Sequence, residues 1–310
     1  MRLVGGLAAA SAAALALPPV ASAHGIVPIS QLSSTWRSDA AVIVPACVLA
    51  ALFAQAFIRL RRRGRTDHAG IDRAVLFGLA LTIGTLALLS PLDSAGEHYL
   101  LSAHMLQHVL VGDAAPALAL VALRGPLLFF LIPPIVLGPL ARLAPLRNAL
   151  SWLLRPAVAL TLWAIVFAVW HVPAVYDATL SHQGLHDFEH ALFVLAGLAV
   201  WTQIVDPARH GTLSVPQRIA IAVALFAAGQ ILSYVLVFSF QPLYPAYADQ
   251  PARLFGWSPL LDQQLAGVVM MIEQLLTLGT AVAILLHVST QRRRSPLGLS
   301  PLTRAGTERS

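Results

Sequence analysis

Histidines recur one helical turn apart at two places in a strongly apolar chain. His104 and His108 lie in the stretch HMLQH, and His186 and His190 lie in LHDFEH. Residues four apart share one face of a helix, so each pair would present two imidazoles in the same direction. Because imidazole nitrogens bind copper, zinc, iron and nickel, this spacing indicates a metal or haem site if the two helices are neighbours.

The elements that carry these histidines are predicted to be membrane helices. Of the 310 residues, 57% are hydrophobic and 11% are charged, whereas soluble domains carry about 25% charged residues. A span needs about 20 mostly apolar residues. Seven stretches are candidates: 39–59, 73–91, 100–123, 156–175, 187–205, 218–240 and 263–288. The predicted fold class is all-α, a polytopic membrane helix bundle with seven transmembrane helices.

Arginines predict how these helices are oriented. All 20 basic residues are arginine, and 17 of them lie after the first, third and fifth spans or in the C-terminal tail. The opposite ends, apart from the leader, hold only Arg37 and Arg253. Cytoplasmic loops carry the excess of basic residues, so the N-terminus is predicted outside and the C-terminus in the cytoplasm. The connection 124–155 has an apolar run broken by Pro133 and Pro134, and is predicted to lie on the surface or to re-enter rather than to cross.

Three regions are predicted along the chain. Residues 1–23 resemble a signal peptide, because Arg2 precedes a short apolar core and Ala21-Ser22-Ala23 fits a cleavage site. Residues 24–290 form the seven-span membrane domain. Residues 291–310 are polar and contain proline, and they are predicted to be a disordered basic cytoplasmic tail.

The predicted orientation places the histidines at one level on the outer side. His104 and His108 would lie ~6 and ~12 Å into the third span. The other pair opens the fifth span, and His171 closes the fourth. If these helices pack together, five imidazoles converge on one metal site: His104, His108, His171, His186 and His190. Haem held by axial histidines and interhelical hydrogen bonding by histidine are the alternative explanations.

Other polar residues nearby are candidates for supporting roles. Glu189 precedes His190 and could orient a ligand imidazole. Met105 would face a neighbouring helix, where it could supply a soft ligand of the kind that favours Cu(I), although methionines in membrane helices more often fill the core or face lipid. Asp262 could cap the start of the seventh span, where a carboxylate is favoured, or support the histidine layer.

Two carboxyl side chains fall near the middle of predicted spans. Asp113 lies five residues past His108, about 140° round a regular helix, so it is expected to contact a different helix. Glu273 lies near mid-membrane in the seventh span. An ionisable residue at this depth is costly and indicates a functional site. Tyr176 and Trp201 are expected in the aromatic belts at the membrane surface.

The motifs also exclude several classes of protein. Cys47 is the only cysteine, so thiolate clusters and disulfide frameworks are excluded. The nucleotide-binding loop GxxxxGK[ST], the GxSxG elbow and HExxH do not occur, and an enzyme is not predicted. The net charge of +6 does not indicate nucleic acid, because the arginines stand in short runs between apolar stretches.

Four motifs occur in an order that resembles a known family. HMLQH (104–108), WHVPAVYD (170–177), LHDFEH (185–190) and DQQLAG (262–267) are similar to those of the CtaG family of multi-span cytochrome c oxidase assembly factors. The resemblance covers about residues 35–290, and the family is associated with maturing the copper-containing form of the oxidase. It implies a shared site formed by His104, Met105, His108, His171, His186, His190, Asp262 and Gln263.

Together these patterns predict a multi-pass protein of the plasma (inner) membrane. It would bind or deliver copper through the histidine cluster and assist the assembly of cytochrome c oxidase. Its expected partners are oxidase subunits, periplasmic or extracellular copper carriers and the lipid bilayer. A haem-binding or electron-transfer protein, and a scaffold for oxidase subunits with histidines as hydrogen-bond donors, are the other readings.

The arginine distribution leads to a testable topology. We expect a reporter enzyme fused after Ser310 to be active only when it is a type that works in the cytoplasm. Activity of a reporter that works only outside the cytoplasmic membrane would contradict this orientation.

Overall fold

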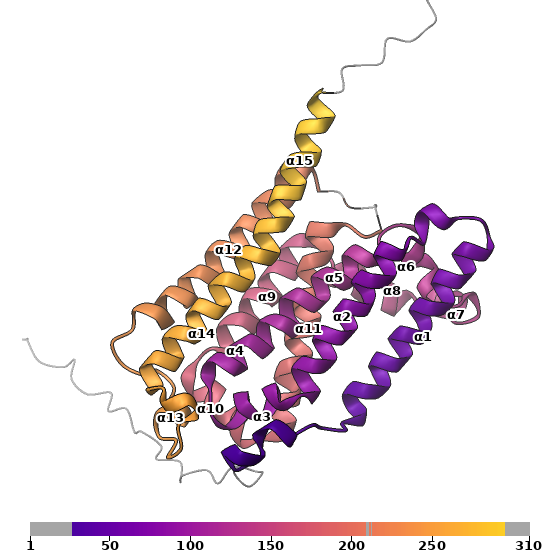
Figure 1. Cartoon of the computed structure of the whole chain (residues 1–310). Helices are drawn as coiled ribbons and strands as arrows, with labels where there is room; N and C mark the ends of the chain where they lie inside the picture. The colour runs from indigo at the N-terminus through magenta and orange to yellow at the C-terminus, as the bar shows by residue number, and fades with distance from the viewer. Residues whose placement is uncertain (1–26, 209–210, 212, 295–310) are drawn as a thin grey trace, which may run out of the picture.

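The chain is helical throughout the part that the structure describes. A computed structural model describes residues 27–208, 211 and 213–294, and within these ranges it contains no strand (Figure 1). The predicted all-α class is therefore confirmed. The predicted signal peptide, 1–23, lies outside the described residues, as does most of the predicted tail.

Six stretches are long and apolar enough to cross a membrane. They are Ala40–Arg62 (α1), Thr66–Leu89 with α2 (Ile71–Leu89), Leu101–Ala122 with α4 (Leu101–Val109) and α5 (Ala115–Ala122), Gln183–Val205 (α11), Val215–Phe238 (α12), and Pro259–Gln291 with α14 (Pro259–Gln274) and α15 (Thr280–Arg294). A seventh is added if α8 (Ala144–Leu153) and α9 (Pro156–Trp170), which meet at 72°, form one bent span. The protein is thus a multi-pass membrane protein, with six or seven candidate spanning helices in the part of the chain that the structure describes.

The boundaries differ from the predicted ones at two places. The fourth predicted span, 156–175, is interrupted after α9, because the chain turns at His171 and a new helix, α10 (Pro173–Ser181), begins. Helix α15 continues to Arg294, so the first residues of the predicted tail are helical. The new helix start coincides with Pro173, whose fixed φ and missing N–H suit the first helical position.

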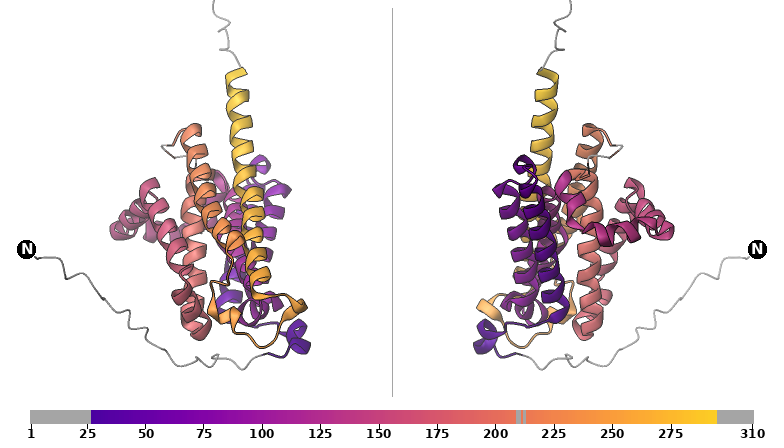
Figure 2. Two further views of the ribbon diagram at one scale, coloured as in Figure 1. Left: turned by 90° about the vertical axis from the view of Figure 1, so that its left-hand side faces the viewer. Right: turned by 90° about the vertical axis from the view of Figure 1, so that its right-hand side faces the viewer.

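Short helices cover both ends of the bundle. Helices α3 (Pro91–His98), α10 and α13 (Pro245–Ala248) lie at one end, called here the histidine end, and α6 (Pro126–Leu131) lies at the other (Figure 1). Helices α7 (Pro134–Arg142) and α8 have no buried residue and project sideways from the bundle (Figure 2). The connection 124–155 therefore consists of three short helices, and its position relative to the membrane stays a prediction.

Two of the long stretches contain π-helical turns near their middle. These turns are Leu110–Ala114, between α4 and α5, and Leu275–Gly279, between α14 and α15. A π turn accommodates an additional residue, which rotates the side chains beyond it relative to a regular helix, and such turns are frequent at functional sites. The Thr277 hydroxyl donates a hydrogen bond to Asp113 at 3.1 Å, so the two π turns contact each other.

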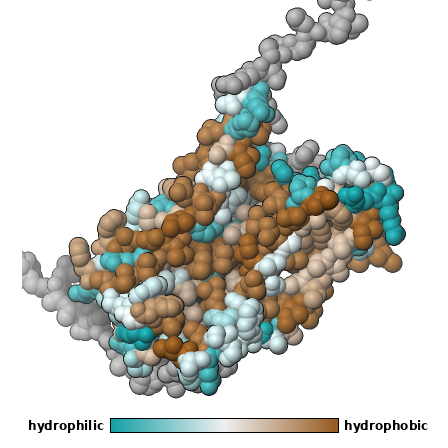
Figure 3. Space-filling model, viewed as in Figure 1, coloured by the Kyte–Doolittle hydropathy of each residue, from teal (hydrophilic) through white to brown (hydrophobic). Residues whose placement is uncertain are grey.

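Apolar side chains cover the outside of the bundle between two hydrophilic ends (Figure 3). Inside, small residues allow close contact between helices. A Cβ atom on Gly197 of α11 would overlap the carbonyl oxygen of Gly112, and one on Gly229 of α12 would overlap the Gln274 amide. Small residues serve the same purpose in other membrane proteins, where close backbone approach supplies packing that lipid cannot.

Gly197 offers a direct test of this close contact. The change Gly197→Ala should separate α11 from the π turn at Gly112. It should lower the free energy of unfolding by about 1–3 kcal/mol, as overpacking of a core does, and therefore lower the thermal unfolding temperature of the purified protein. Gly78→Ala in α2 is the matched control, since a Cβ there meets nothing within 4 Å. Equal stability of the two variants would contradict the contact.

Candidate metal centre

The structure brings the two predicted histidine pairs into contact. His104 and His108 on α4 face His186 and His190 on α11. The ring centre of His104 lies 5.1 Å from that of His186, and the ring centre of His108 lies 5.3 Å from that of His190. All four side chains are buried. Four imidazoles from two helices thus form one cluster at the histidine end.

Two overlapping sets of donor atoms in this cluster could hold a metal ion. One set is His104, His108 and His190, and the other is His104, His186 and Glu189, with donor atoms within 4.8 Å of one another in each. A metal held by bonds of about 2.1 Å needs donors no more than roughly 4.2 Å apart. Small side-chain adjustments would therefore be enough to close either set round an ion.

His171 lies at the edge of the cluster rather than inside it. It follows the end of α9, and its ring centre is 6.3 Å from that of His108. Its Nδ1 donates to the Phe167 carbonyl at 2.7 Å. Because a carbonyl can only accept, this bond leaves Nε2 as the nitrogen with a free lone pair. His171 belongs to neither three-residue set, but its free nitrogen lines the adjoining cavity.

A tyrosine fixes the protonation pattern of His104. The Tyr247 hydroxyl donates to the Gly96 carbonyl at 2.6 Å, and its oxygen lies 3.1 Å from His104 Nδ1. Burial raises the pKa of Tyr247 well above its usual value, so the hydroxyl keeps its single proton. That proton is given to Gly96, so His104 must donate from Nδ1, and the lone pair of its Nε2 faces His108 Nε2 at 2.8 Å.

Glu189 is fully buried among the imidazoles. Its carboxylate lies 3.6 Å from His108 Nε2, and its exposed fraction is 0%. It therefore faces a histidine on the opposite helix rather than its sequence neighbour His190. A carboxyl group in this position offers oxygen donors to a cation bound among the imidazoles.

Several buried polar atoms of the cluster have no hydrogen-bond partner among the described residues. They are His108 Nδ1, both ring nitrogens of His186, His190 Nε2, His171 Nε2 and both carboxylate oxygens of Glu189. Buried polar groups are normally paired, and leaving one unpaired costs about 1–3 kcal/mol. Their concentration at one place indicates a site prepared for a ligand.

Asp262 holds the helix that carries His104 and His108. One carboxylate oxygen accepts from the Leu101 N–H at 2.7 Å, and the other accepts from the N–H and hydroxyl of Ser102 at 3.1 and 2.5 Å. These groups form the start of α4. The cap of Asp262's own helix, α14, is instead Ser258. Asp262 thus caps a neighbouring helix, an arrangement that the sequence alone did not distinguish from capping of its own.

Gln263 and Met105 belong to neither of the two three-residue donor sets. Gln263 accepts from the Leu243 N–H at 2.6 Å and donates to carbonyls at the end of α12. It therefore holds the loop that leads to Tyr247. Met105 is fully buried and lines the cavity beside His108.

Sequence patterns missed the tyrosines that cover the cluster. Tyr176 was expected at the membrane surface, but it is fully buried and its hydroxyl lies 3.0 Å from that of Tyr247. Tyr244 donates to the His171 carbonyl at 3.1 Å. Tyr244 and Tyr247 lie in the loop after α12, outside any apolar periodicity, so no local signal related them to the histidines.

The geometry now allows comparison with known proteins. The model of the family described as cytochrome c oxidase caa3 assembly factor (Caa3_CtaG) matches residues 51–291. The chain belongs to this family. Its members are assembly factors rather than catalytic enzymes, and the matched range includes all five predicted histidine ligands.

Two curated relatives match over most of this chain. They are uncharacterized protein Mb0105 of Mycobacterium bovis and uncharacterized protein MT0111 of Mycobacterium tuberculosis. Each is 26% identical over 279 residues, which are 86% of this chain and 41% of the relative. The Caa3_CtaG chain thus spans less than half the length of these relatives. No solved structure matches.

The role of Asp262 can be tested by removing its carboxylate. Asp262→Ala should leave the first N–H groups of α4 unpaired, and loss of such a cap typically costs about 0.5–2 kcal/mol. We expect a lower unfolding temperature than for Asp39→Ala, which removes an exposed cap from α1 and touches no histidine. If the two variants unfold alike, the buried cap does not hold α4.

Proposed function

We propose that this Caa3_CtaG protein binds copper at the histidine cluster and supports the assembly of the copper-containing cytochrome c oxidase. The cluster would face the outer side of the plasma membrane, where periplasmic or extracellular copper carriers have access. Oxidase subunits would receive the metal or be matured beside it. The arginine-rich connections at the opposite end support this orientation.

The observation that carries the proposal is the set of unpaired donor atoms. In the cluster, buried ring nitrogens and the Glu189 oxygens lie close to one another without hydrogen-bond partners. A bound cation would pair with several of these atoms at once. Tyr247 and the Phe167 carbonyl bind the Nδ1 atoms of His104 and His171, which leaves the His171 Nε2 unpaired and directs the His104 Nε2 toward His108. Second partners of this kind orient metal-binding histidines in other proteins.

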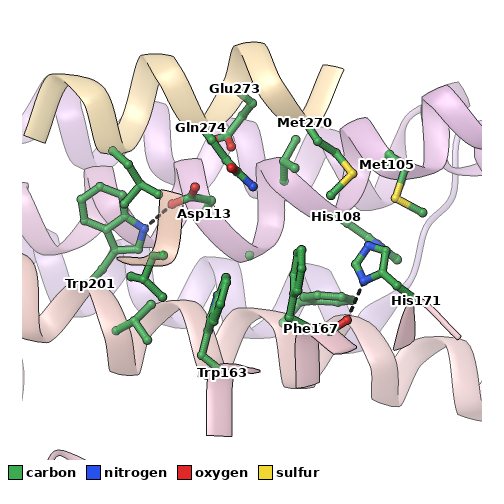
Figure 4. A pocket seen from close by; sticks show the side chains of 16 residues that line it. Met105, His108, Asp113, Trp163, Phe167, His171, Trp201, Met270, Glu273 and Gln274 are labelled. Carbon is green, nitrogen blue, oxygen red and sulfur yellow. Dashed lines mark hydrogen bonds between the residues drawn. The ribbon is translucent and has the colours of Figure 1, made fainter. Parts of the chain in front are cut away.

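The donor set favours copper among the metals that imidazole binds. Met105 and Met270 line the cavity beside His108 and His171, and Figure 4 shows the two thioethers at the same end of this cavity. Soft thioether ligands favour Cu(I), whereas imidazole alone also suits zinc. Copper also fits the family's description as assembly factors of a cytochrome c oxidase, because the oxidase to be matured contains copper.

The haem alternative receives less support from the geometry. The ring centres of His104 and His186 lie 5.1 Å apart and those of His108 and His190 lie 5.3 Å apart, so the imidazoles contact one another across the space between α4 and α11. The adjoining cavity measures about 50 Å³, whereas pockets for molecules of cofactor size measure about 300–1,000 Å³. The scaffold alternative does not account for the unpaired nitrogens, because interhelical hydrogen bonding would pair them.

The test is copper content and oxidase maturation in histidine variants. His108→Ala and His190→Ala should each reduce bound copper and active oxidase strongly, because both belong to one three-histidine set. The double variant should be little worse than either, since groups that act together are not additive. Metal analysis of the purified protein and oxidase activity in a deletion strain give the two measurements.

His182→Ala is the matched control, because this exposed histidine bonds only to the Ala178 carbonyl and lies outside both donor sets. It should keep normal copper. Normal copper and normal oxidase in a well-expressed His108→Ala protein would disprove the metal site. Zinc in place of copper would overturn the metal assignment, and a reduced-minus-oxidised spectrum with sharp bands would favour haem.

A further inference from the structure

A pair of carboxyl groups lies deep in the bundle, away from the histidine cluster. Asp113 belongs to the π turn after α4, and Glu273 lies in the last turn of α14, just before the second π turn. At 1.5 Å per residue, they lie ~18 Å from the start of α4 and ~21 Å from the start of α14. Ionisable side chains at this depth are costly and usually mark a functional site.

Asp113 is held in place by donors from two other elements. The indole N–H of Trp201 on α11 donates to one carboxylate oxygen, and the Thr277 hydroxyl donates to the other. Trp201 is buried rather than placed in a surface belt. Each Asp113 oxygen therefore has a donor, and the side chain is fixed between α11 and the second π turn.

Glu273 lacks such donors. Its side chain is 9% exposed, and neither carboxyl oxygen receives a hydrogen bond from a donor group of the described residues. It lies against the Asp113 carboxyl instead. Ionised carboxylates only accept hydrogen bonds, so the two groups can bond to each other only through a proton.

A cavity joins this pair to the histidines. It has a volume of about 50 Å³, and a water molecule needs roughly 10–15 Å³ of such space, so a short chain of waters fits. Figure 4 shows His108 and His171 toward one end and Asp113 and Glu273 toward the other. These four are the titratable side chains among its lining residues, which include no arginine.

The π turn explains why Asp113 reaches this cavity. In a regular helix Asp113 would lie about 140° away from His108. The additional residue of the π turn rotates it back, and both side chains line the same space. The backbone thus places a carboxyl group and an imidazole at opposite ends of one water-sized path.

We propose that Asp113 and Glu273 share one proton and form a mid-membrane proton-relay site that exchanges through this cavity with the histidine end. In the exchange, one O–H bond of a cavity water breaks and that proton binds to the carboxyl pair. At the same time the O–H bond of the pair breaks, and the proton released binds to the water oxygen. Charge and atoms balance, and no metal takes part. The proton-relay proposal can therefore be tested independently of copper binding.

Infrared spectroscopy of the full-length protein in lipid nanodiscs tests this site without added metal. At neutral pH the wild type should show the C=O band of a protonated carboxyl, and transfer into deuterated buffer should shift it. Glu273→Gln should abolish the band, because Asp113 alone is surrounded by donors that favour its ionised form. The isosteric double variant Asp113→Asn/Glu273→Gln should also lack it.

Glu189 is likewise fully buried without a donor and gives a band of its own, so each variant is also measured in the Glu189→Gln background, where the band of the pair should remain in place. In that background, absence of the band, or a band that survives in the double variant, would overturn the proposal. A band that persists in Glu273→Gln would place the proton on Asp113 alone and refute sharing. A band unaffected by deuterated buffer would refute exchange through the cavity.

Discussion

Hydrocarbon offers no hydrogen bonds, and this constraint governs the interior of the protein. Each polar group placed between the helices must find its partner within the chain. Most do: the start of α4 is bonded to Asp262, and Asp113 receives donors from Trp201 and Thr277. Among the described residues, most of the buried side-chain atoms that lack partners belong to the histidine cluster and to Glu273, and the others are single oxygens of Gln107, Asp177 and Gln183. Where pairing is otherwise so thorough, the gaps at the cluster and at Glu273 identify the places where a ligand or a proton completes the structure.

Helix α4 is the element on which the histidine cluster depends. Asp262 bonds its first turn, and Gln107 on its other side donates to Asp93, which in turn accepts from Arg37 at 2.6 Å. Tyr247 adds a contact to His104 from the loop after α12. Three segments distant in sequence thus fix the direction of one helix. Donor groups held by such contacts need little reorganisation when a metal binds, which is the usual requirement for a preorganised site.

The two sites share a cavity but differ in chemistry. The cluster at the histidine end combines nitrogen donors with thioethers, which suits a soft cation. The inner pair consists of oxygen acceptors without a cation beside them, which suits a proton. Both π turns lie at the level of the inner pair, so the departure from regular helix serves the deeper site. The outer histidine pairs need no π turn, because i, i+4 spacing already aligns their side chains on one face of α4 and of α11.

Local sequence patterns predict the helical class, most spans and the two histidine pairs that meet between α4 and α11, because apolar length and four-residue spacing are local properties. They also mark helix starts through prolines such as Pro173. Tertiary packing sets which buried groups pair. Asp262 caps α4, Glu189 faces His108, and Tyr247 fixes the His104 tautomer. Tertiary packing also sets the π turn that brings Asp113 into the cavity. The reason is physical, since the partner of a buried polar group depends on which helices pack together and in what register, and no local periodicity encodes that choice.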